Sequence, residues 1–67
     1  MNVFVNKEPF EASENDTLST VLEKLELHTQ KGIAVAVNNA VVPRTNWGSK
    51  AIQAEDKITI IKATQGG

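Results

Sequence analysis

The sequence contains no cysteine and no tyrosine, and among its 67 residues it has only one histidine, one tryptophan and two prolines. Without cysteine, no disulfide can hold a small fold together, and a single histidine has no second imidazole with which to share a metal. The fold therefore depends on one hydrophobic core. Apolar residues make up 40% of the chain, which argues against disorder. Because so short a chain buries a small fraction of its surface, we expect one domain with a thin stability margin.

Charge of neither sign predominates, since seven basic and eight acidic residues give a formal net charge of −1. Nucleic-acid binding usually requires a basic patch, which this balance does not indicate. The longest apolar run, Gly32 to Val37, is far too short to span a membrane. Lys7 and Glu8 stand where a secretion signal needs apolar residues. We therefore expect a cytoplasmic protein, monomeric when free, that binds neither nucleic acid nor membranes.

Alternating apolar residues predict several short strands. Strands are expected at residues 1–6, 8–12, 33–38 and 57–63, with a brief one at 40–42 that Pro43 ends. At the junction of the strands predicted at 33–38 and 40–42, Asn38-Asn39 suits a tight turn, because asparagine tolerates left-handed backbone conformations. In the middle strand the valines are expected to face the core and the alanines to face away.

One amphipathic helix is predicted between the second and third strands. Its apolar face is formed by Leu18, Val21, Leu22 and Leu25. These residues are spaced i, i+3, i+4 and i+7, which places them on one side of a helix. Asp16 or Thr17 can cap the start of the helix, and Gly32 can take a positive φ after its end.

The predicted order of elements indicates an α+β fold. Two strands, a helix, a strand, a brief strand and a last strand can form a mixed sheet of four or five strands with the helix packed on one face. This is the β-grasp, or ubiquitin-like, arrangement. We expect residues 1–63 to form the β-grasp domain and residues 64–67 to form a flexible tail that ends in Gly66-Gly67.

Side-chain chemistry is poorly supported by the sequence. His28 is the only histidine and lies in a polar stretch, so a solvated surface residue is expected rather than the base of a catalytic triad. The acidic residues of the first quarter of the chain are scattered, and there is no phosphate-binding glycine loop. We therefore predict that the protein is not an enzyme and holds no metal.

Two interpretations of the terminal Gly66-Gly67 are possible. Glycines at a terminus are often only disordered residues without a function. Alternatively, two residues without Cβ let the backbone thread a narrow channel and present a bare carboxylate to another enzyme. That carboxylate is a poor electrophile until it is activated, for example by adenylation. Gly67 would then be the reacting residue.

The sheet face opposite the helix is the second candidate feature. Phe4, Ile61 and Ala63 have the parity that points away from the helix and could form an exposed apolar patch for a partner. The alternative is that the loop 44–54 folds over this face. Parity alone leaves the two possibilities open.

At this point the residues suggest a family. The run Val-Pro-Arg-x-x-Trp at residues 42–47, the polar turn Glu55-Asp56 before the last strand, and the terminal Gly66-Gly67 together resemble the ThiS family, the sulfur carriers of thiamine biosynthesis. The resemblance extends over the whole chain. The sequence departs from the family pattern at Glu55, where glycine is common, and at Gln65, where a small residue is common.

The resemblance implies a function for the tail. In such carriers a ThiF-like enzyme adenylates the C-terminal glycine with Mg-ATP. Sulfur from cysteine, passed on by a desulfurase or sulfurtransferase, then converts the acyl adenylate to a thiocarboxylate. A ThiG-like thiazole synthase takes up the sulfur. By this resemblance Gly67 bears the sulfur, Gly66 is its permissive neighbour, and the carrier itself binds no cofactor.

Two residues of the Val-Pro-Arg-x-x-Trp run, Arg44 and Trp47, are interpreted separately from the tail. Arg44 is either a surface residue or a partner contact. Trp47 is expected to be structural, because a large ring can close one end of a small core.

Three other functions remain open. A MoaD-like carrier for molybdopterin synthesis would have the same fold, tail and chemistry. A ubiquitin-type modifier would be joined through its tail to lysines of other proteins. A non-covalent β-grasp binding module would keep its partner affinity after both glycines are deleted, whereas a carrier would lose all activity.

Overall fold

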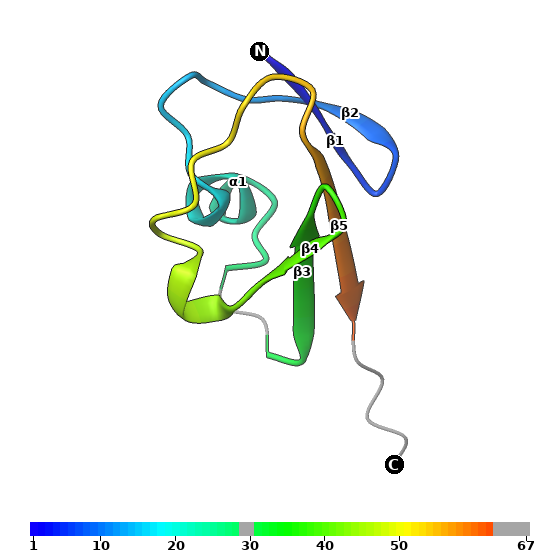
Figure 1. Cartoon of the computed structure of the whole chain (residues 1–67), viewed down its shortest axis with the longest axis vertical. Helices are drawn as coiled ribbons and strands as arrows, with labels where there is room; N and C mark the ends of the chain where they lie inside the picture. Colours follow the sequence, from blue (N-terminus) through cyan, green and yellow to red (C-terminus); the bar gives the residue numbers. More distant parts are fainter. Residues whose placement is uncertain (29–30, 63–67) are drawn as a thin grey trace.

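The computed structural model describes residues 1–28 and 31–62. Five strands, one α-helix and one 3₁₀ turn make up the fold (Figure 1). In chain order these are β1 (Asn2–Val5), β2 (Glu8–Glu11), α1 (Leu18–Lys24), β3 (Ile33–Val37), β4 (Ala40–Val42), η1 (Arg44–Asn46) and β5 (Lys57–Lys62). Among the described residues, no helix is both long enough and apolar enough to cross a membrane.

The strands form one mixed sheet in the order β2-β1-β5-β3-β4. The central pair, β1 and β5, is parallel, and every other neighbouring pair is antiparallel. The predicted β-grasp architecture is confirmed. Three strands end one residue earlier than predicted, at Val5, Glu11 and Val37, and β1 also starts one residue later, at Asn2. After β3, Asn38 has a φ of 53° and already begins the turn. The predicted last residue of β5, Ala63, lies outside the described residues.

Two hairpins have two-residue turns with positive φ at both central positions. Asn38 and Asn39 have φ of 53° and 70°, which confirms the predicted tight turn. Asn6 and Lys7 join β1 to β2 with φ of 50° and 72°. This geometry matches the right-handed twist of the strands, and glycine is usual at its second position. A lysine there is therefore unusual.

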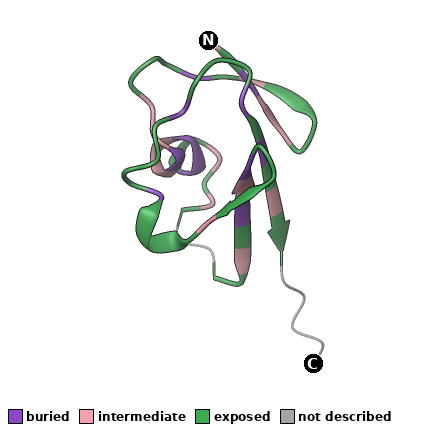
Figure 2. Ribbon diagram, viewed as in Figure 1, coloured by how far each residue is buried: buried purple, intermediate pink, exposed green. Residues whose placement is uncertain are grey.

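The hydrophobic core lies between α1 and one face of the sheet (Figure 2). It consists of Val3, Ala12, Leu18, Val21, Leu22, Val35, Val37, Trp47, Ile52 and Ile58. The valines of β3 thus face the helix, as predicted, while Leu25 follows the helix as its half-buried C-cap. Burial of these side chains is the main source of stability in the absence of disulfides.

Thr17, one of the two predicted candidates, caps α1. Its side chain accepts a hydrogen bond from the Thr20 N–H, and the Thr20 hydroxyl accepts one from the Thr17 N–H. Asp16 braces this capping box, since its carboxylate accepts hydrogen bonds from the Thr20 hydroxyl at 3.0 Å and from Lys24 Nζ at 2.7 Å. The capping box satisfies the N–H groups of Thr17 and Thr20 at the start of a seven-residue helix.

The long segment between η1 and β5 packs against the helix. The N–H of Ser19 donates to the Trp47 carbonyl at 3.0 Å, and the N–H of Leu18 donates to the Lys50 carbonyl at 2.8 Å. Ile52 is buried in the core. The predicted alternative that this loop covers the opposite sheet face is therefore wrong, because its hydrogen bonds hold it on the helical side.

Leu22→Ala tests how far stability depends on the core. Leu22 is fully buried, so its truncation leaves a cavity and should lower the free energy of unfolding by roughly 2–5 kcal/mol. Urea denaturation followed by circular dichroism measures the change. Glu23→Ala, at the exposed neighbour, is the matched control. A loss below about 1 kcal/mol for Leu22→Ala, within the range of conservative core changes, would contradict the assigned core.

Asp16 should make stability depend on pH. The hydrogen bond from Lys24, followed by that from the Ser13 N–H, lowers the pKa of Asp16 below its ordinary value of 3.8. Because the folded pKa is below the unfolded one, the stabilisation is complete above the unfolded pKa and disappears as the pH falls through the folded pKa.

Asp16→Asn should therefore be less stable than the native chain at pH 7, and the difference should shrink as the pH falls below about 4. Urea midpoints measured from about pH 7 down to about pH 2 check this expectation. Lys24→Met removes the main cause of the shift and should weaken the pH dependence. If the difference in urea midpoint between Asp16→Asn and the native chain stayed constant over this pH range, the stabilising role assigned to the Asp16 carboxylate would be refuted.

Glu55 has a φ of 67°, which accounts for the glycine common at this position in the family pattern. Glu55→Gly should raise the free energy of unfolding by roughly 0.5–1 kcal/mol, because relief of left-handed backbone strain exceeds the added entropy of the unfolded chain. Glu14→Gly, at an exposed turn residue that is not among those with positive φ, should instead destabilise the chain. Equal effects of the two substitutions in urea denaturation would contradict this explanation.

Candidate functional site

The central strand β5 leads directly to the C-terminal tail. β5 pairs with β1 on one side and with β3 on the other, and its Ile58 is anchored in the core. The candidate residues Ala63, Gly66 and Gly67 lie outside the described residues.

Asp56 holds the start of β5. Its carboxylate accepts hydrogen bonds from the Asn38 amide at 2.9 Å and from the Gln53 N–H at 2.8 Å. The Asn38 side-chain oxygen in turn accepts from the Lys57 N–H at 3.0 Å. Asp56 is buried, and these bonds tie the β3–β4 turn to the first residue of β5. The sequence predicted only a polar turn here.

Asn6 supports β5 further along. Its side-chain oxygen accepts a hydrogen bond from the Ile60 N–H at 2.8 Å, and its own N–H donates to the Ile58 carbonyl at 2.8 Å. β1 ends at Val5, so the Asn6 side chain supplies a partner where the backbone ladder stops. Sequence reasoning missed this contact, which joins residues 54 positions apart.

The outer sheet face is the side of the sheet opposite α1. It carries Phe4, Ala34, Ala36, Val41, Thr59 and Ile61, as the strand pairings place them. Ile61 is 58% exposed and Val41 is 74% exposed, whereas Phe4 is half-buried. The predicted outward orientation of Phe4 and Ile61 is confirmed. Val41 was missed, although its pairing with Ala36 puts it on the same face.

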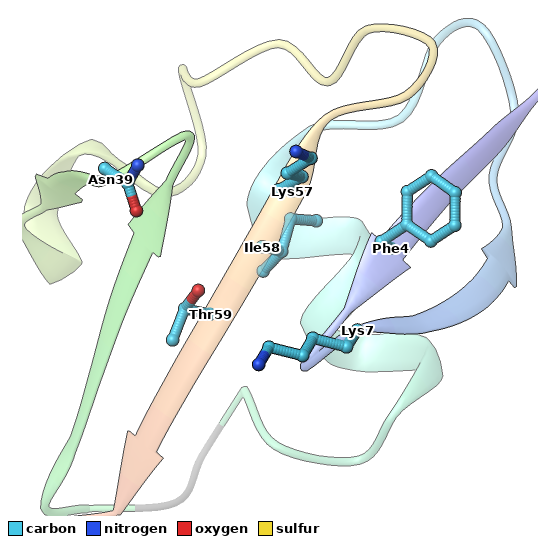
Figure 3. Close-up of a pocket in the computed structure, with 6 residues that line it drawn as sticks. All are labelled: Phe4, Lys7, Asn39, Lys57, Ile58 and Thr59. Atoms are coloured by element: carbon cyan, nitrogen blue, oxygen red, sulfur yellow. The ribbon is translucent and has the colours of Figure 1, made fainter.

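A hollow of about 460 Å³ lies on this face beside the start of β5 (Figure 3). Its lining residues are Phe4, Lys7, Asn39, Lys57, Ile58 and Thr59. Figure 3 shows α1 behind the sheet, so the hollow opens away from the helix. The Lys7 side chain extends from the β1–β2 turn toward β5. The hollow therefore combines an apolar ring with two ammonium groups.

Arg44, the first residue of η1, and Trp47, which caps its end, pack against each other. The Arg44 guanidinium lies 4.6 Å from the centroid of the Trp47 ring, and its Nη1 donates to the His28 carbonyl at 3.3 Å. Trp47 is buried, and its Nε1 donates to the Val42 carbonyl at 2.9 Å. The predicted structural role of Trp47 is confirmed. A partner contact by the exposed Arg44 stays a prediction.

Other candidate chemistry is sparse in the part of the chain that the structure describes. His28 is exposed, as predicted. No group of three or more histidine, cysteine, aspartate or glutamate side chains within residues 1–28 and 31–62 is arranged to hold a metal ion. The arrangement offers a strongly anchored strand that leads to the tail, beside an exposed apolar and basic surface.

Comparison with known sequences identifies related proteins. Residues 3–67 match the model of the ThiS family. The sulfur carrier protein ThiS of Escherichia coli (strain K12) is 30% identical over 67 residues, which cover the whole of both chains. A thiazole synthase of Magnetococcus marinus is 34% identical over the same 67 residues, which match 20% of that longer protein.

Comparison with solved structures supports the fold. The crystal structure of the thiamine biosynthesis protein ThiS from Geobacter metallireducens has a TM-score of 0.85 at 22% identity, with both chains fully covered. SAMP1 from Haloferax volcanii has a TM-score of 0.67 at 14% identity, with 98% of this chain and 97% of that one covered. At these identities the similarity establishes the β-grasp fold alone.

The family match, in contrast, runs from the first strand to the terminal glycine and agrees with the full-length similarity to the Escherichia coli carrier. The chain belongs to the ThiS family, whose members are small carrier proteins and not enzymes.

Proposed function

We propose that this chain is a sulfur carrier of thiamine biosynthesis and that the Gly67 carboxylate bears the sulfur. The observation that carries this proposal is the family match over residues 3–67, which includes the terminal Gly66-Gly67. The Escherichia coli sulfur carrier ThiS, which aligns over its entire length, supports it. The function thus belongs to the end of the main chain rather than to a side chain.

The chemistry starts with activation of a poor electrophile. A carboxylate oxygen of Gly67 attacks the α-phosphorus of ATP, and pyrophosphate leaves. A ThiF-like adenylating enzyme supplies the site for Mg-ATP, so the carrier needs no metal or cofactor of its own. The terminal sulfur of a protein persulfide, formed from cysteine by a desulfurase or sulfurtransferase, then attacks the acyl carbon, and AMP leaves. A thiol attacks the donor sulfur of the resulting acyl disulfide, so that a disulfide forms between that thiol and the donor and a C-terminal thiocarboxylate is released.

A ThiG-like thiazole synthase is the proposed acceptor of the sulfur. The Magnetococcus marinus thiazole synthase contains a segment that resembles this whole chain. Carrier-like and synthase sequences therefore occur in one polypeptide in that relative. Joining two binding partners in one polypeptide keeps each at a high effective concentration for the other. The joined sequences therefore support the synthase as a binding partner.

Docking of the domain follows from the short tail. Because the residues after Lys62 span at most about 18 Å, the acting enzyme must contact the domain near the end of β5. Ile61 is exposed there on the outer sheet face. We propose that Phe4, Ile61 and Ala63 contact the partner, with Arg44 as a further contact, while Gly66 lets the tail enter a narrow channel.

Gly67→Ala tests the role of the tail. Stability should change by less than about 0.5 kcal/mol, as for surface sites, whereas thiocarboxylate formation should fall roughly 100-fold, because misplacement of a reacting group by about 1 Å has effects of that size. The measurement is the intact mass of the protein after incubation with adenylating enzyme, Mg-ATP and sulfur donor. Charged protein is heavier by the difference between sulfur and oxygen.

The chain that lacks Gly66 and Gly67 is the negative control and should keep its native mass. Normal charging of Gly67→Ala would refute the narrow-channel argument. An uncharged full-length chain under the same conditions would refute the carrier function. If the truncated chain also kept its affinity for partners, the protein would instead be a non-covalent binding module.

A further inference from the structure

Two lysines beside the hollow on the outer sheet face lack acidic partners within the described part of the chain. In the described part of the chain, the ion pairs join the N-terminus to Glu11 and Lys24 to Asp16. Neither pair involves Lys7 or Lys57. Both lysines are exposed, and both line the hollow together with Phe4. In a protein with a net charge of −1, this is a local basic site around an apolar ring.

The backbone at Lys7 strengthens the case for a role in binding. Lys7 occupies the second central position of a two-residue turn with a φ of 72°, where glycine fits without strain. Strained residues tend to occur where a side chain serves a function that outweighs its effect on stability. Figure 3 shows the Lys7 side chain extending toward β5, and a glycine would provide no such side chain.

The hollow and the exposed Ile61 lie along one strand, β5. Lys57, Thr59 and Ile61 alternate along the outer sheet face of β5, so the hollow at the start of the strand and the exposed Ile61 near its end share one surface. Four residues of strand span roughly 13 Å. One partner surface of ordinary size, about 800 Å², therefore covers both and fixes the direction in which the tail leaves.

We propose that this hollow is the anchoring site for an acidic segment of the thiazole synthase, with a partner apolar side chain against Phe4 and carboxylates against Lys7 and Lys57. The inference rests on the proposed carrier function. The synthase is chosen as occupant because the Magnetococcus marinus relative joins the two sequences in one chain. The unpaired ammonium groups require that the synthase surface be acidic.

This site sets the orientation of the carrier before the tail is inserted. Contact at Ile61 alone would leave the domain free to rotate about one point. A second contact at the start of β5 removes that freedom and directs the C-terminus into the active site. Exposed charge pairs act mainly on the association rate and are sensitive to salt, so the anchor should show these two signatures.

The test is direct binding of the uncharged full-length carrier to the thiazole synthase of the same organism, measured by biolayer interferometry. Lys7→Gln and Lys57→Gln should each raise Kd about 3-fold, and the double variant should raise it roughly 10-fold, mainly through slower association. The difference should vanish near 1 M salt, where charges are screened within about 3 Å. Lys57→Arg should bind like the native chain.

Lys50→Gln is the matched control, because it makes the same change in net charge at an exposed lysine whose backbone carbonyl accepts a hydrogen bond from the Leu18 N–H on the helical side. Lys7→Gly gives a sharper signature. It should raise the urea midpoint by relieving strain at a φ of 72°, yet weaken synthase binding. A purely structural lysine would not move stability and affinity in opposite directions.

The inference is overturned if the double variant binds the synthase as tightly as Lys50→Gln at low salt, or if the native chain does not bind the synthase. Greater loss of binding to the adenylating enzyme than to the synthase would also overturn it. Intact-mass measurements separate this result from the proposed function, because the double variant should still acquire sulfur. Failure of the native chain to acquire sulfur would refute the carrier function, whatever the lysines do.

Discussion

The hydrogen bonds of Asp56 are the constraint on which the rest of the structure depends. One buried carboxylate joins the loop at Gln53, the β3–β4 turn at Asn38, and the start of β5. A shift of one residue in the pairing of a strand would exchange the residues on its two faces. The residue at which β5 starts therefore decides that Ile58 lies in the core and that Ile61 is exposed.

The fold separates stability from function. Stability comes from the apolar face of α1 packed on one side of the sheet, and the long loop reinforces that side through Ile52 and Trp47. Within residues 1–28 and 31–62, no helix or loop covers the opposite side, which leaves Ile61 and Val41 exposed. A second layer there would cover the surface that the proposed partner contacts need.

Sequence periodicity predicted what depends on burial of one face: the apolar residues of α1, the inward valines, and the outward Phe4 and Ile61. It could not predict two contacts made across the fold: the bond from the Asn38 amide to the Asp56 carboxylate joins side chains 18 residues apart, and the bond from the Ile60 N–H to the Asn6 side chain joins residues 54 positions apart. Nor does it reveal the positive φ of Lys7. The role proposed for Gly67 was predicted from family resemblance, because a terminal glycine pair alone is also explained as a disordered end without a function.

The short tail and the exposed sheet face are complementary parts of one design. A longer tail would reach an active site without domain contact, but the effective concentration of its end falls as the linker lengthens beyond the span it must cover. In the proposed carrier function, the reach of at most about 18 Å after Lys62 lets the C-terminus enter an active site only when the domain itself docks. Recognition of the folded surface would then be a condition for the proposed chemistry at Gly67, so that a reactive C-terminus would be delivered only to an enzyme that also fits β5 and its neighbours.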